Sequence, residues 1–137
     1  MKKALIVRGG WDGHEPVQVA DHFARILTES GMSVEISDTL DAFKDEALMK
    51  DLSLIVPVWT MGDIQSDQLK PLLDAVREGC GIAGVHGGMG DAFRQQTEYQ
   101  FMVGGQWVAH PGGAGVTYTV HIVDPWNPLT SGIGDFD

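Results

Sequence analysis

The chain has 137 residues, 43% of them hydrophobic and 20% charged, which suits one globular domain and excludes a disordered chain. Its formal net charge of −10 repels nucleic acid and anionic membranes, and it favours a small neutral ligand or a bound cation. Cys80 is the single cysteine, so no internal disulfide is expected, and the apolar run over residues 4–7 is too short for a signal peptide or a membrane span. We therefore expect one cytoplasmic domain over residues 1–137.

Apolar runs and amphipathic spacings alternate along the chain, which is the pattern of a parallel α/β protein. In chain order we expect a strand over 4–7, a helix from Pro16 to near Gly31, a strand over 32–36, a short helix over 40–48, a strand over 52–59, a helix over 69–79, a strand over 82–86, a helical stretch over 91–101 and a fifth strand over 116–123. Pro71 predicts that its helix starts late or is kinked.

The predicted core residues lie in these strands, and they are Leu5, Val7, Leu54, Val56, Ile82 and Val85. Helices should cover both faces of the parallel sheet. In such folds ligands bind beyond the carboxyl ends of the strands. Functional side chains are therefore expected just after Val7, Val58 and Val85.

The loop after the first strand, Gly9 to Pro16, is glycine-rich, so a nucleotide site has to be considered. Its spacing differs from G-x-G-x-x-G, and Asp12 and Glu15 would place negative charge where a phosphate should bind, so we expect no nucleotide cofactor. His14 is a candidate functional residue above the strand ends. The alternative is that Glu15 caps the helix and His14 is a solvated loop residue.

The fourth strand leads into Gly84-Val85-His86-Gly87-Gly88, which matches the G-x-nucleophile-x-G elbow with histidine at its centre. Small residues on both sides allow a sharp turn that exposes the middle side chain above the sheet. His86 could act as a general acid or base, or bind a metal through a ring nitrogen. The alternative is a core histidine hydrogen-bonded to a neighbouring loop.

Acidic residues follow the elbow. Asp91, Arg94 and Glu98 share one face of a helix at spacings of three and four. Asp91 or Glu98 could orient His86 or serve as a second acid/base group, so both join His86 as catalytic candidates. The alternative is a surface salt bridge with Arg94. Further on, His110 lies in a loop shaped by glycines and a proline, where the alternative is a solvated turn residue.

Three tryptophans, Trp11, Trp59 and Trp107, fall on loops or strand ends, where an indole face can stack on a sugar ring. With Asp12 they are the candidates for substrate binding, and the alternative for each tryptophan is that it fills a gap under a loop. The candidate histidines could also converge with a carboxylate to bind a divalent metal such as zinc. That set would be His14, His86 and His110 with Asp12, Glu15 or Glu98.

Four segments together resemble the ThuA-like trehalose-utilisation family. They are Gly9–Pro16 (GGWDGHEP), Trp59–Gly62 (WTMG), Gly84–Phe93 (GVHGGMGDAF) and Tyr99–Gly113 (YQFMVGGQWVAHPGG). The resemblance implies a class I glutamine amidotransferase-like fold, which is a flavodoxin-like parallel sheet with helices on both faces. It also implies functional histidines at His14, His86 and His110, and a role in the metabolism of trehalose and related disaccharides, including 3-keto sugars. Because family domains continue further, residues 1–137 are expected to form a C-terminally incomplete domain.

The leading hypothesis is an enzyme that acts on a carbohydrate such as a keto-disaccharide, through histidine acid/base or metal-assisted chemistry. The alternative is a non-catalytic sugar-binding or regulatory module with the same fold. A glutamine amidotransferase needs a cysteine at the elbow, where His86 stands, and an NAD-dependent oxidoreductase needs the phosphate fingerprint that the first loop lacks. The expected partner is a small carbohydrate, without nucleic acid or membrane, and a homo-oligomer is left open.

Overall fold

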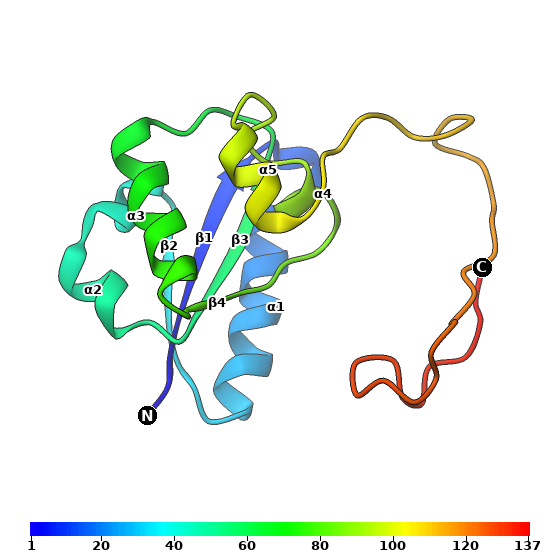
Figure 1. Ribbon diagram of the computed structural model, residues 1–137, viewed down its shortest axis with the longest axis horizontal. Helices are drawn as coiled ribbons and strands as arrows, with labels where there is room; N and C mark the ends of the chain where they lie inside the picture. The colour runs from blue at the N-terminus through cyan, green and yellow to red at the C-terminus, as the bar shows by residue number, and fades with distance from the viewer. The chain divides into compact units, whose positions relative to one another are not determined.

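Four parallel strands run through the centre of the first 107 residues (Figure 1). The computed structural model covers residues 1–137 and separates them into two units, Met1–Trp107 and Val108–Asp137. All strand pairings in the first unit are parallel, which confirms the predicted α/β fold class. The strands are β1 (Lys3–Gly10), β2 (Ser33–Ser37), β3 (Leu54–Thr60) and β4 (Gly81–Ile82), in the spatial order β2-β1-β3-β4.

Helices cover both faces of this sheet, as the sequence predicts (Figure 1). α1 lies on one face, and α2, α3 and α5 lie on the other. None of the helices is long and apolar enough to cross a membrane. The helical segments are η1 (Asp12–His14), α1 (Pro16–Glu29), η2 (Leu40–Lys44), α2 (Glu46–Asp51), α3 (Ser66–Arg77), α4 (His86–Gly90) and α5 (Thr97–Val103).

Side chains alternate along β1 and β3, so each strand contributes to two cores. Ile6, Val56 and Val58 point toward α1 and pack with Ala20. Their neighbours in sequence point the other way, into a larger core. That core includes Leu5, Val7, Phe43, Ile55, Leu72, Phe93 and Tyr99. The same alternation decides which face of the sheet each residue at a strand end belongs to.

The helices after β2 differ in detail from the predicted pattern. The expected short helix is split at Asp45, whose carboxylate accepts two backbone N–H groups and so caps a separate α2. α3 already begins at Ser66 and includes Pro71, so the late start is wrong, because a capping box at Gln65 stabilises the first turn. α5 begins later than predicted, since Phe93 has a left-handed φ of 51° that interrupts any helix from residue 91.

β4 is much shorter than predicted. It pairs with β3 only through Gly81 and Ile82, because the chain then turns away toward the elbow glycines. Val85 lies beyond the last paired residue and is 49% exposed, so its predicted burial is wrong. Of the other predicted core residues, Leu5, Val7 and Val56 are buried, and Leu54 and Ile82 are partly buried.

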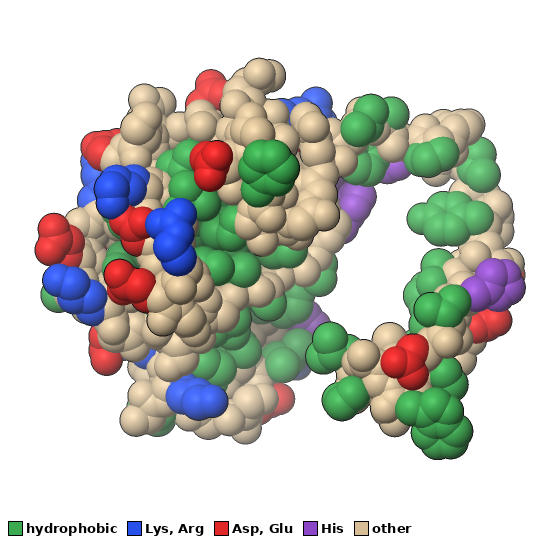
Figure 2. Space-filling view, viewed as in Figure 1, with side chains coloured by type: hydrophobic (Ala, Val, Ile, Leu, Met, Phe, Trp, Pro, Cys, Tyr) green, Lys and Arg blue, Asp and Glu red, His purple; other side chains and the backbone are tan.

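The second unit contains no strand over residues 116–123, so the predicted fifth strand is wrong. Its one ladder contact is an antiparallel bridge between Val120 and Phe136, next to a hydrogen bond of 2.8 Å between the side chains of His121 and Asp135. A lone strand has no neighbour for its backbone hydrogen bonds and no second layer to cover its apolar face. Figure 2 accordingly shows hydrophobic side chains standing exposed along this unit.

Candidate functional site

His14 is placed at the strand ends by the loop that follows β1. Glu15 takes a left-handed φ of 49° after η1, and Pro16 then opens α1. The Nδ1 atom of His14 lies 2.9 Å from Oγ1 of Thr60, which is the buried last residue of β3. The carbonyl of Thr60 also accepts the backbone N–H of Trp11 at 3.1 Å. His14 is therefore a partly buried residue joined to the neighbouring strand, not a solvated loop residue.

His86 stands at a strained turn at the start of α4, as the elbow pattern predicts. Its φ is 44°, in the left-handed region that favours glycine. A Cβ atom on Gly84 would lie 2.6 Å from Cβ of Met89, and a Cβ atom on Gly87 would lie 2.5 Å from Cε1 of His14. Glycine at these two positions therefore allows the sharp turn and lets His14 approach it.

Four aromatic rings lie one after another across the strand ends. The ring centroids of Trp11 and His14 are 4.8 Å apart, those of His14 and His86 are 4.9 Å apart, and those of His86 and Trp107 are 6.1 Å apart. The contacts are tilted or edge-on, which aromatic pairs prefer to a face-to-face sandwich. The backbone N–H of Trp107 donates to the carbonyl of Gly90 at 3.3 Å and holds the indole near the elbow. The structure thus brings together four of the predicted site residues.

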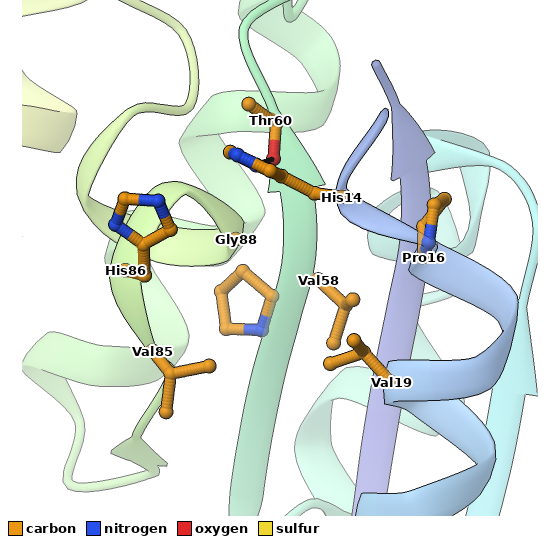
Figure 3. A pocket seen from close by; sticks show the side chains of 9 residues that line it. His14, Pro16, Val19, Val58, Thr60, Val85, His86 and Gly88 are labelled. Atoms are coloured by element: carbon orange, nitrogen blue, oxygen red, sulfur yellow. Dashed lines mark hydrogen bonds between the residues drawn. The ribbon is translucent and has the colours of Figure 1, made fainter. Parts of the chain in front are cut away.

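A cavity of about 130 Å³ lies beside the two histidines (Figure 3). His14 enters it from the α1 side and His86 from α4, and Thr60 supplies a third polar side chain. The rest of the lining consists of Pro16, Val19, Pro57, Val58, Val85 and Gly88. The sequence interpretation missed Thr60 and this apolar wall. The alternation of side chains along β3 could have predicted this position of Thr60, because Thr60 faces the same side of the sheet as Val58, two residues earlier.

His86 also lines a second, larger cavity of about 280 Å³ on the side of Trp107. The other residues of its lining are Met89, Gly90, Val103, Gly105 and Gln106. His86 therefore borders two cavities, one on each side of the elbow. The first is walled mainly by aliphatic side chains, whereas the second adds an indole, an amide and backbone groups to Met89 and Val103.

Asp91 is buried, and Arg94 binds both of its carboxylate oxygens, at 2.5 and 3.0 Å. This charged hydrogen bond raises the pKa of the Arg94 guanidinium. The backbone carbonyl of Asp91 accepts the N–H of Met61 at 2.9 Å, which joins the segment after the elbow to the end of β3. The geometry therefore favours the salt-bridge alternative for Asp91. Glu98 is exposed in the first turn of α5, and an orienting role for either carboxylate toward His86 stays a prediction.

The remaining candidates are Trp59, Asp12 and His110. Trp59 points to the opposite face of β3 from Thr60, where its ring centroid is 6.4 Å from that of Phe93 and its buried indole N–H has no hydrogen-bond partner. Asp12 is exposed in η1. His110 belongs to the second unit, so its convergence with the other two histidines stays a prediction. The structure contains no group of three His, Cys, Asp or Glu side chains arranged to hold a metal ion.

Comparison with known proteins bears on the resemblance seen in the sequence. A family model described as trehalose utilisation (ThuA) matches residues 3–137. No curated protein and no solved structure matches the chain. The family match spans both units and includes all three candidate histidines.

Proposed function

The chain belongs to the trehalose-utilisation (ThuA) family, which has the class I glutamine amidotransferase-like fold, and from this premise we propose that it is an enzyme acting on a carbohydrate. The proposed site is the pair of His14 and His86, with His86 as the acid/base. One observation carries the proposal: the ring of His86 lies 4.9 Å from a second imidazole. Its strained φ of 44° and its position at the edge of a cavity support it. Backbone strain of this kind concentrates at functional sites.

Histidine suits proton transfer near neutral pH, because one ring nitrogen can accept a proton while the other donates one. In the proposed mechanism His86 accepts a proton from a hydroxyl group of the bound sugar, or from a C–H group next to its carbonyl. His14 has its Nδ1 atom at Thr60, which leaves Nε2 to bond to the substrate. Trp11 and Trp107 flank the pair and offer indole faces to the C–H groups of a sugar.

A metal-assisted form of the proposal uses the same two residues. Zinc takes three or four protein ligands, of which His14 and His86 would supply two. In this form His110 would be the third ligand, and a carboxylate of Asp12, Glu15 or Glu98 would complete the set. Elemental analysis distinguishes the two forms: stoichiometric zinc that disappears in His14→Ala supports the metal-assisted form, and full activity after chelation supports acid/base chemistry alone.

A glutaminase activity is disfavoured by the chemistry of the elbow. That reaction needs a cysteine thiolate where His86 stands. Cys80 lies before β4, and burial raises the pKa of its thiol, so less of it is ionised near neutral pH. We expect no release of ammonia from glutamine, and release that depends on Cys80 would contradict this part of the proposal.

The proposed partner is a small carbohydrate, and trehalose and keto-disaccharides are the first substrates to test. A net charge of −10 disfavours nucleic acid and anionic membranes as partners. We place the protein in the cytoplasm, a reducing compartment that suits a chain whose one cysteine is free.

His86→Ala tests the proposal directly. We expect turnover to fall by about a hundredfold or more, because a general acid or base contributes about 10²–10⁴-fold, while sugar binding measured by calorimetry persists. His22→Ala is the matched control, since His22 is exposed in α1 and its ring nitrogen lies 3.2 Å from Arg25. Unchanged turnover in His86→Ala would contradict the proposal. A wild-type protein that binds sugars and converts none would support the non-catalytic sugar-binding module instead.

A further inference from the structure

The cavity beside His14 and His86 has polar groups at one end only (Figure 3). His14, Thr60 and His86 lie at that end, while Val19 of α1 and Val58 of β3 form walls below them. Pro57 and Val85 complete the apolar part. A ligand in this cavity therefore meets aliphatic side chains over most of its surface and hydrogen-bonding groups only where it approaches the histidines.

The cavity has a volume of about 130 Å³ and is partly open to solvent, so only the part of a ligand that enters it has to be small. An apolar cavity of about 150 Å³ binds one benzene molecule. A sugar ring carries hydroxyl groups around its edge, and those placed against Pro57 or Val58 would lose their hydrogen bonds to water without replacement. The cavity therefore suits one small apolar ring or a short alkyl chain better than it suits a sugar.

The cavity on the other side of His86 has a mixed apolar and polar lining. It is larger, at about 280 Å³, and its lining combines Met89 and Val103 with the indole of Trp107, the amide of Gln106 and the backbone of Gly90 and Gly105. An indole covers the C–H face of a sugar, and amide and backbone groups bond to its hydroxyls. This side of the elbow suits a sugar ring.

We propose that His86 separates two subsites, an apolar one beside His14 that takes a small ring or alkyl group and a sugar subsite at Trp107. The substrate is then a carbohydrate with a small apolar substituent, such as an aryl or alkyl glycoside, and the junction of its two parts lies beside His86. The inference rests on the proposed function for the reaction, but its binding preference follows from the two cavities alone.

Binding of benzyl glucoside and methyl glucoside, measured by calorimetry, tests this preference without any turnover. The wild type should bind benzyl glucoside about tenfold or more tightly than methyl glucoside, since filling an apolar pocket discriminates by that much. Benzyl alcohol alone should shift the NMR signals of the Val19 and Val85 methyl groups. Val85→Phe should fill the pocket and remove the benzyl preference. Val17→Phe is the matched control, because Val17 is 47% exposed against 49% for Val85 and lines neither cavity.

Equal binding of the two glucosides by the wild type, absent methyl shifts, or a benzyl preference that survives Val85→Phe would overturn the two subsites. If Val85→Phe fails to fold, the near-isosteric Val85→Thr replaces it and should weaken the binding of benzyl alcohol. A benzyl preference without turnover of any glycoside would support the two subsites and contradict the proposed enzymatic function. Turnover of trehalose without a benzyl preference would support the proposed enzymatic function and contradict the two subsites.

Discussion

The two units of the chain contain the same kinds of apolar residue but use them differently. Leu72 and Tyr99 in the first unit are fully buried, whereas Leu129 and Tyr118 in the second are 86% and 71% exposed. The first unit repeats its apolar residues at strand and helix spacings, so neighbouring elements bury one another's faces. The second unit has apolar side chains without a second layer to pack on (Figure 2). An apolar side chain stabilises a fold only when other elements cover it.

Leucine truncation should give the largest difference between the units. Leu72→Ala should lower the free energy of unfolding by about 2–5 kcal/mol, because it leaves a cavity in the core. Leu129→Ala should change it by less than about 0.5 kcal/mol, as is usual for exposed positions. Urea unfolding followed by circular dichroism measures both. A Leu129→Ala effect as large as that of Leu72→Ala would mean that the second unit has a core of its own.

Substitution of a glycine by alanine should have the next largest effect, and it tests the close approach of His14 to the elbow. Gly87→Ala would place a methyl group 2.5 Å from Cε1 of His14, so we expect a loss of about 1–3 kcal/mol from overpacking and a displaced His14. Gly115→Ala in the second unit meets no atom within 4 Å and serves as the control. Both variants are compared with the wild type by thermal unfolding and by the rate of the proposed carbohydrate turnover. Full activity in Gly87→Ala would show that the close approach of the two histidines is unnecessary.

Removal of a tyrosine hydroxyl should have a smaller effect. The Tyr99 hydroxyl donates to the carbonyl of Met89 at 3.0 Å and ties α5 to the elbow helix. Tyr99→Phe should therefore cost about 0.5–1.5 kcal/mol, while Tyr118→Phe should cost nothing measurable.

The pH dependence of stability sharpens this tyrosine comparison. Burial raises the pKa of Tyr99 above its ordinary value of about 10. The folded protein thus keeps this proton to higher pH than the unfolded chain does, so the contribution is complete below about pH 10 and is lost as the pH rises through the folded pKa. Tyr99→Phe should reduce the loss of stability at alkaline pH, and Tyr118→Phe should not. An identical alkaline slope in the wild type and Tyr99→Phe would show that the buried Tyr99 hydroxyl is not responsible for this loss.

Thiol labelling gives the smallest effect. Because burial raises the pKa of Cys80, this thiol should react more slowly with iodoacetamide at neutral pH than an exposed cysteine in the second unit. Ser131→Cys in a Cys80→Ser background supplies that exposed thiol. Mass spectrometry over time compares the rates, and equal rates would show that the surroundings of Cys80 do not protect it.

Local pattern predicted most of the first unit and the general position of the site. The apolar runs of β1 and β3 and the spacing in α1 are properties of short segments, and they identify those elements without knowledge of the fold. The glycines around His86 likewise predict a sharp turn, which the φ of 44° at this residue confirms. The pattern at residues 116–123 was equally strand-like, yet no strand forms there, because a strand also depends on a neighbour that its own residues do not specify.

The sequence by itself therefore determined a parallel α/β fold with glycine-flanked histidines after two of its strands, because backbone geometry and apolar periodicity act over a few residues. The tertiary structure alone decided which side chains meet. It joined His14 to Thr60 across 46 positions, placed Trp59 on the far face of β3, and put an aliphatic cavity beside His86. Each of these contacts depends on strand order and on the side of the sheet that a residue faces, and both are set only when the whole sheet assembles.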